Sequence, residues 1–142
     1  MKKISTVLFF KEGVTFRLNQ QSDLQKWIVK AAKNEGYAIE QINYIFCSDK
    51  YLKKMNVDFL NHNYYTDIIT FDNSIEKKKI IADIFISIDT IRLNAIEYQS
   101  GFNNELHRVM IHGLLHLVGY SDKNLKHQKE MRTREDFWLK KI

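Results

Sequence analysis

The fold class of this chain is decided where strand-like sequence changes to helix-like sequence, within residues 80–118, which read IIADIFISIDTIRLNAIEYQSGFNNELHRVMIHGLLHLV. Residues 80–88 are rich in isoleucine and predict a strand. Asp89 can cap a helix over residues 89–98, because its side chain can accept a hydrogen bond from the backbone of the first turn. Another helix is expected from about residue 103 to residue 118. The stretch therefore predicts one strand followed by two helices.

Outward from this stretch, the sequence predicts several strands before it and one more helix after it. Two β-rich runs, Ile4–Phe10 and Val14–Leu18, flank a turn-like triplet at residues 11–13 and indicate an opening hairpin. The other expected elements are a helix over residues 22–36, a strand over 41–47, a helix over 48–60, a strand over 67–72 and an amphipathic helix over 125–140. This order predicts an α+β domain, with a mixed sheet of about four to five strands packed against about five helices.

Size and composition indicate one folded domain over residues 1–142. The length lies within the roughly 100 to 200 residues of a typical domain. Hydrophobic residues make up 44% and charged residues 27% of the 142 residues, which is ordinary for a folded protein. The chain has no proline and no low-complexity tract, so nothing in it resembles a linker between independent units.

Membrane and exported proteins are disfavoured by the apolar runs and by the cysteine count. The longest apolar run is interrupted by Asp83 and stays short of the roughly 18 residues of a membrane span. The run Ile4–Phe10 is short and lacks a small-residue cleavage site, so we interpret it as a strand and not as a signal peptide. Cys47 is the single cysteine and lies in an apolar run, which predicts a buried, unreactive thiol. We expect a cytoplasmic protein, with a monomer favoured.

The charge balance favours anionic partners. Lysine and arginine outnumber aspartate and glutamate by 22 to 17, giving a net charge of +5. Two lysine groups stand out: one on the outer face of the first helix and one in a loop between strands, which are Lys26, Lys30 and Lys33, and Lys77, Lys78 and Lys79. The loop group is compatible with a solvated turn and with contacts to a phosphate backbone.

Residues 112–122, which read HGLLHLVGYSD, predict a metal site on a central helix. His112 and His116 are one helical turn apart, so their Cβ atoms lie about 5–6 Å apart on one face, and both rings can bind one tetrahedral ion. Gly119 permits the left-handed conformation that ends a helix, so the chain can return and add Asp122 as a third ligand. The pattern therefore predicts a mixed histidine and carboxylate site.

The rest of this helix is consistent with a functional role for its polar residues. Apolar side chains cover most of its circumference, and the polar ones form a narrow stripe of Glu105, Arg108, His112 and His116. The histidine spacing also resembles that of zinc metalloproteases, in which a glutamate after the first histidine is the general base. Gly113 occupies that position here, so peptide hydrolysis by that mechanism would lack its proton acceptor.

These residues resemble the signature of the YbeY endoribonuclease family, H-G-x-L-H-L-x-G-Y followed by a polar residue and a third ligand. Residues 112–120 match each fixed position of that signature. Residues 60–61 and 66–71 are similar to the family's L-N and T-D-V-L-S-F, and residues 83–87 are similar to its G-D-I-x-I-S strand. The resemblance covers most of the chain.

The resemblance implies a single α+β domain that binds one metal ion, usually taken as zinc. It also implies metal-dependent endoribonuclease activity on single-stranded RNA, in the maturation of small-subunit ribosomal RNA and in ribosome quality control. His112 and His116 would then be ligands, and His112 would be essential for catalysis. Single-stranded RNA, ribosomal RNA and the small ribosomal subunit are the expected partners.

The chain departs from the family pattern in two places. The family commonly has a third histidine ligand where this chain has Asp122, and an arginine where this chain has Tyr65. Because that arginine is thought to serve the RNA phosphate, we consider Arg108 as its catalytic and substrate-binding substitute, together with the lysines at 77–79. An ion pair of Arg108 with Glu105 is an equally good interpretation of its position.

Several other polar residues have a structural interpretation beside a functional one. Asp67 and Asp83 could orient the site, although carboxylates at strand ends usually bind loop amides. His62 and His107 are expected to be surface or loop residues without a metal role. Tyr120 is expected to pack at the end of the helix.

The identity of the third ligand leaves two candidates, Asp122 and His127. Family habit favours a histidine, but His127 is expected within the last helix, so we predict Asp122. Sites with two histidines and one carboxylate bind zinc and also iron(II), so another divalent metal is compatible. A non-catalytic RNA-binding or ribosome-assembly factor with a structural ion is the main alternative function, and a metalloprotease-like hydrolase is the third.

Overall fold

The computed structural model describes residues 6–60 and 66–142 and contains a four-stranded mixed sheet. The strands are β1 (Val7–Glu12), β2 (Ala38–Cys47), β3 (Ile68–Asp72) and β4 (Lys79–Ser87), in the order β1-β2-β4-β3. β1, β2 and β4 are parallel, and β3 is antiparallel to β4. The prediction of an α+β domain with a mixed sheet is confirmed.

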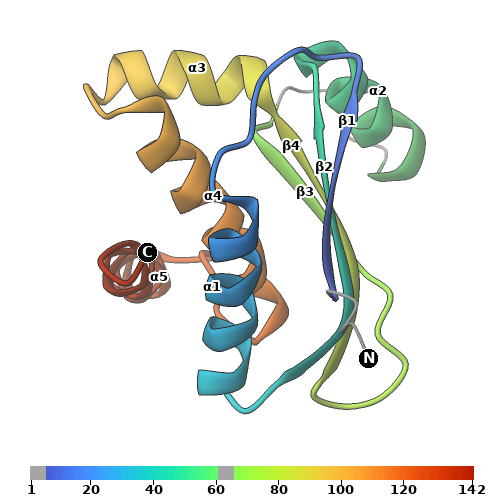
Figure 1. Cartoon of the computed structure of the whole chain (residues 1–142), viewed down its shortest axis with the longest axis vertical. Helices are drawn as coiled ribbons and strands as arrows, with labels where there is room; N and C mark the ends of the chain where they lie inside the picture. Colours follow the sequence, from blue (N-terminus) through green and yellow to red (C-terminus); the bar gives the residue numbers. More distant parts are fainter. Residues whose placement is uncertain (1–5, 61–65) are drawn as a thin grey trace.

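Five helices lie in the described part of the chain: α1 (Gln21–Asn34), α2 (Asp49–Leu60), α3 (Ile88–Glu97), α4 (Phe102–Leu117) and α5 (Leu125–Leu139). Figure 1 shows α1, α3 and α4 on one side of the sheet and α2 on the other. α5 packs outside α4, and its Trp138 carbonyl accepts a hydrogen bond of 2.8 Å from the Trp27 indole of α1.

The main core lies between the sheet and the helices α1, α3 and α4. Alternate residues of β4 are buried, in agreement with the two-residue repeat of a strand, and Ile84 and Ile86 are fully buried. Tyr44 of β2 is also fully buried, and its hydroxyl donates a hydrogen bond of 3.0 Å to the Met110 carbonyl of α4. Apolar burial and this satisfied polar contact fix α4 against the centre of the sheet.

A glycine permits the closest approach between α4 and the sheet. A Cβ added at Gly113 would lie 3.0 Å from the Cδ1 atom of Ile68 and 3.3 Å from the side chain of Ile84. Any larger side chain would have to displace these isoleucines, which lie in a well-packed region. Gly113 therefore sets the distance between α4 and the strands β3 and β4.

The predicted opening hairpin is wrong. β1 pairs in parallel with β2, and Val14–Leu18 is not a strand but part of the connection to α1. The apolar residues of this connection pack on the core: Leu18 is buried, and the Phe16 ring lies 5.2 Å from that of Phe46. Apolar residues alternate along this connection because they are buried against the helical side of the sheet. A β-rich sequence pattern cannot distinguish such burial from strand pairing.

Two smaller predictions also differ from the structure. Ser87, and not Asp89, caps α3, because the Ser87 hydroxyl accepts a hydrogen bond from the Thr90 backbone. β2 starts at Ala38, three residues earlier than predicted, because parallel pairing with β4 extends to Lys79. Boundary shifts of this size do not alter the order of the elements.

No helix in the described part of the chain is long and apolar enough to cross a bilayer.

Candidate metal centre

The centre of the candidate site is the polar stripe of α4, a helix that is otherwise largely buried. His112 and His116 lie on this stripe one turn apart, and their ring centroids are 4.6 Å apart. Their Nε2 atoms face each other at 3.1 Å. The side chains of His112 and His116 are 22% and 33% exposed, so the pair is accessible from one side.

The chain after α4 brings Asp122 to the two histidines, as predicted. Gly119 follows the C-terminal end of α4 with a φ of 106°, a conformation that glycine adopts without strain. The Oδ2 atom of Asp122 then lies 3.7 Å from the Nε2 atom of His112 and 3.5 Å from that of His116. Of the described residues, these three supply a cluster of donor atoms within 4.8 Å of one another.

The donor spacing fits a tetrahedral ion. Metal–ligand bonds of about 2.0–2.1 Å at tetrahedral angles place ligand atoms about 3.3 Å from each other. The three observed separations, 3.1, 3.5 and 3.7 Å, lie on both sides of this value. Two neutral imidazoles and one carboxylate suit zinc and neighbouring divalent metals.

A buried carboxylate of α5 orients His112. The Oε2 atom of Glu135 lies 2.6 Å from the Nδ1 atom of His112, and Glu135 is only 5% exposed. With the Nδ1 proton donated to Glu135, the Nε2 lone pair of His112 points toward His116 and Asp122. This carboxylate–histidine arrangement is the one that usually supports a metal-binding histidine.

Arg108 completes a chain of contacts behind His112. Its Nη1 atom lies 2.9 Å from the Oε1 atom of Glu135, and its Nη2 atom lies 2.7 Å from Asp136. The predicted alternative, an ion pair with Glu105, is therefore replaced by pairs with two residues of α5. In this structure Arg108 holds Glu135 in place, and both of its terminal nitrogens are paired.

Neighbouring charges shift the pKa of His112. Burial lowers the pKa of His112, but the hydrogen bond and negative charge of Glu135, together with Asp67 and Asp122, raise it above the ordinary value in the metal-free protein. Burial also raises the pKa of the Asp67 carboxyl, which the His112 charge lowers in turn. Asp67 thus lies within electrostatic reach of the candidate ligands.

The other predicted orienting residue, Asp83, lies elsewhere. It lies in the middle of β4 and not at a strand end, and its carboxylate accepts hydrogen bonds from the side-chain amides of Asn43 of β2 at 2.9 Å and of Asn73 at 3.4 Å. Tyr120 packs at the end of α4, and its hydroxyl donates a hydrogen bond of 3.1 Å to Glu35. It contacts the C-terminal end of α1 and not the histidine pair.

His107 and His127, the remaining histidines within the described residues, do not join the cluster of donor atoms. The prediction that His107 is a surface or loop residue is wrong: it is buried on α4, its ring lies 6.1 Å from that of Trp27, and burial lowers its pKa. The helical periodicity alone would have placed it on the apolar side. His127 lies in the first turn of α5, where Asn124 caps its backbone. His62, like Tyr65, lies outside the described residues.

The loop lysines are not part of this cluster either. Lys77 and Lys78 form the turn before β4, and Lys79 is the first residue of that strand. The Nζ atom of Lys78 lies 6.0 Å from the centre of the Tyr37 ring, which follows the C-terminal end of α1.

Sequence reasoning missed Glu135, although α5 carries a signal for it. Met131, Glu135 and Trp138 are the buried residues of α5 and follow the helical spacing i, i+4, i+7. A glutamate on the buried face of a helix requires a partner, because an unpaired buried charge is strongly unfavourable. This spacing could have identified Glu135 as a residue paired with α4.

Comparison with known proteins points to one family. The model of a family described as "Endoribonuclease YbeY" matches residues 10–142. A protein named endoribonuclease YbeY from Cytophaga hutchinsonii is 54% identical over 134 residues, which cover 94% of each chain. Another of the same name, from Porphyromonas gingivalis, is 43% identical over 133 residues, which cover 94% of this chain and 87% of the relative.

A solved structure supports the same fold. The solution structure of the protein TM1509 from Thermotoga maritima aligns with a TM-score of 0.65 and 26% sequence identity. The alignment covers 94% of this chain and 86% of that one.

Proposed function

Because this chain belongs to the YbeY endoribonuclease family, we propose that it is a metal-dependent endoribonuclease that cleaves single-stranded RNA. The observation that supports this most directly is the convergence of His112, His116 and Asp122 at separations suited to one divalent ion. We further propose that it acts in the cytoplasm on small-subunit ribosomal RNA and in ribosome quality control. The net charge of +5 suits such a polyanionic partner.

Three side chains would bind the zinc ion, and a fourth would orient one of them. The Nε2 atoms of His112 and His116 and one oxygen of Asp122 would bind the ion, and Glu135 keeps the His112 ring in the required orientation. A zinc ion held this way can polarise a phosphoryl oxygen and lower the pKa of water. Asp122 is 51% exposed, so an RNA phosphate can approach from that side.

The number of donors favours a catalytic ion over a structural one. Structural zinc sites are usually closed by four protein ligands, and catalytic sites use three with an open position. Three donor side chains converge here, counting residues 6–60 and 66–142. This favours an enzyme over the alternative of a metal-stabilised RNA-binding factor.

One assay separates the three candidate functions. Purified protein is incubated with a single-stranded RNA and, separately, with casein, with and without a chelator and after re-addition of zinc. We expect cleavage of the RNA that the chelator abolishes and zinc restores, and no cleavage of casein. Binding of the RNA without metal-dependent cleavage would favour the assembly factor, and cleavage of casein would favour a peptidase.

A further inference from the structure

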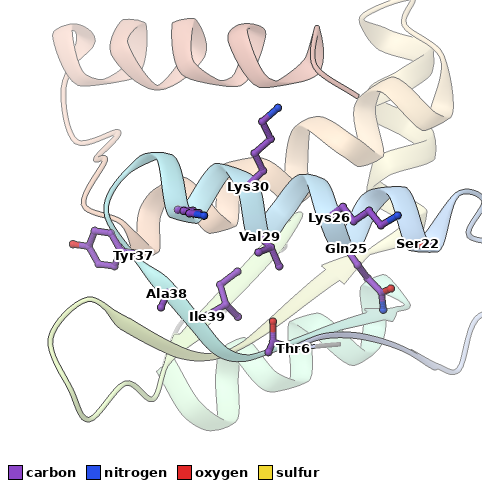
Figure 2. A pocket seen from close by; sticks show the side chains of 10 residues that line it. Thr6, Ser22, Gln25, Lys26, Val29, Lys30, Tyr37, Ala38 and Ile39 are labelled. Carbon is purple, nitrogen blue, oxygen red and sulfur yellow. The ribbon is translucent and has the colours of Figure 1, made fainter. Parts of the chain in front are cut away.

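A second feature of the molecule lies away from the proposed metal centre, between α1, the start of β2 and the residue before β1. It is a pocket of about 810 Å³, within the range of roughly 300 to 1,000 Å³ that is typical of ligand sites. Figure 2 shows Val29 of α1 facing Ile39 and Thr6 across the gap. Lys26 and Lys30 extend outward from α1 at the rim.

The rim of this pocket carries positive charge without compensating carboxylates. Lys26, Lys30 and Lys33 line it at helical spacings of four and three residues, so they are neighbours on one face of α1. Among the described residues, no carboxylate oxygen lies within 4.0 Å of any of their Nζ atoms; the ion pairs present involve other cations. Adjacent like charges disfavour a helix by about 0.2–0.5 kcal/mol per pair. Of the three lysines, Lys33 lies in the last turn of α1, where the helix dipole favours a cation, and Lys26 and Lys30 do not.

Next to the C-terminal end of α1, the pocket also has an aromatic ring and a fourth cation. Tyr37 lines the pocket next to Ala38 and Ile39, and is only partly buried. Lys78, from the turn before β4, lies over the Tyr37 ring. Lysines along a groove, an apolar wall and an accessible aromatic ring are the combination that binds single-stranded nucleic acids without sequence preference.

We propose that this pocket binds a stretch of single-stranded RNA outside the cleavage site, with phosphates along Lys26, Lys30 and Lys33 and a base on the Tyr37 ring. The proposal rests on the proposed function, because it assigns a second contact region for the same substrate. It would explain how the chain holds RNA although Arg108, the predicted phosphate-binding residue, is paired with Glu135 and Asp136.

The pocket and the proposed metal centre are connected through the end of α1. Glu35 lies between Lys33 and Tyr37 in the sequence and accepts a hydrogen bond from Tyr120. Tyr120 in turn precedes Asp122 by two residues. In this proposal a long RNA strand reaches both places, whereas a short oligonucleotide occupies only one.

The test compares two variants of equal charge. Lys26→Ala/Lys30→Ala/Lys33→Ala removes the rim, and Lys50→Ala/Lys53→Ala/Lys54→Ala removes three charges from α2, on the opposite side of the sheet (Figure 1). The Kd for single-stranded RNAs of increasing length is measured against salt concentration, with a chelator present to prevent cleavage. We expect the α1 variant to lose about tenfold or more in affinity for long RNA, with the loss increasing with RNA length.

The salt dependence identifies the contacts. Three lost phosphate contacts should reduce the slope of log affinity against log salt by about 2, at about 0.7 for each phosphate of a single strand. Tyr37→Ala should weaken binding about fivefold or more, and Tyr37→Phe, which keeps the ring, should bind like the wild type. The α2 variant should stay close to the wild type.

The possible failures can be told apart. If both triple variants weaken RNA binding equally, only net charge matters and the pocket assignment is wrong. It is also wrong if a mononucleotide saturates the pocket while the lysine substitutions leave long RNA unaffected. If the α1 variant selectively loses RNA but the wild type with zinc cleaves no RNA, the pocket assignment stands and the proposed nuclease activity is wrong.

Discussion

The polar stripe of α4 and the lysine face of α1 lie on the same side of the sheet but are built in opposite ways. His112 and Arg108 of α4 contact Glu135 of α5 at 2.6 and 2.9 Å, an unbroken series of contacts. On α1, the three lysines have no carboxylate partner among the described residues. Interlocked side chains hold one ion in one geometry, and unpaired lysines adapt to a flexible polyanion. The contrast indicates that the proposed metal centre requires a fixed geometry and that the proposed RNA-binding face of α1 does not.

The largest effect is expected from His112→Ala, which removes one ligand and one of the two partners of Glu135. We expect RNA cleavage to fall by about 1,000-fold or more, because two donors no longer hold the ion in place. The fold should persist, since the core packs around other residues of α4. Metal content, circular dichroism and cleavage of a labelled RNA are measured together. Full activity without bound metal would rule out metal catalysis.

The next effect concerns the third ligand and separates Asp122 from His127. We expect Asp122→Ala to lower zinc affinity by more than the roughly 10- to 100-fold typical of residues that only orient a ligand. His127→Ala should bind zinc like the wild type, because His127 lies in the first turn of α5 and outside the donor cluster. Zinc titration with a competing indicator decides between them. The opposite pattern would mean that the chain after Gly119 runs differently.

A smaller effect is expected from Glu135→Gln, which keeps the size of the side chain but removes its charge. Zinc affinity should fall by about 10- to 100-fold, because the His112 ring is held less firmly and its Nε2 atom becomes less basic. Asp136→Asn is the matched control: it also contacts Arg108, but it is 50% exposed and does not touch His112. Equal losses in both variants would show that Arg108, and not Glu135, is the important partner.

The smallest effect is expected for the rate of thiol labelling at Cys47, which tests whether the α1 and α4 variants keep the native fold. Burial raises the pKa of its thiol to about 12, with smaller contributions from the charges of Asp49, Asp89 and Glu12. At pH 8 only about one thiol in ten thousand is then ionised in the native state. Labelling by a thiol reagent should stay slow and equal in the α1 and α4 variants. Because the folded pKa is raised, the unfolded chain is favoured as pH rises above 9, and labelling should accelerate there.

The fold class could be predicted because most elements have a strong local signal. The isoleucine-rich run of β4 and the helical spacing on α4 and α5 indicate their own secondary structure. The opening hairpin failed because alternating apolar residues such as Phe16 and Leu18 look the same whether they pair with a strand or pack on a core. The parallel pairing of β1 with β2 depends on residues about 35 positions apart, such as Val7 and Ile42, and has no local signature.

The site could be predicted where its residues follow one another along the chain. His112, His116, Gly119 and Asp122 lie within eleven residues; helix geometry pairs the two histidines, and the turn at Gly119 returns Asp122 to them. Glu135 was not predicted because it belongs to another helix. Tertiary packing decides which face of α5 contacts α4, and this has no local signal in the sequence. The pocket on α1 could be predicted only as a lysine face, since its apolar wall comes from β2 and from the residue before β1.

The close approach at Gly113 also limits the reactions that this fold can acquire by point mutation. A zinc peptidase of the H-E-x-x-H type needs a glutamate at this position, with its carboxylate beside the ion. Here a side chain at residue 113 would point into Ile68 and Ile84, and a carboxylate buried there would be both crowded and unpaired. No single substitution therefore leads from this centre to that peptidase mechanism. The histidine spacing is shared with those peptidases, but the position of their general base is closed here by Ile68 and Ile84.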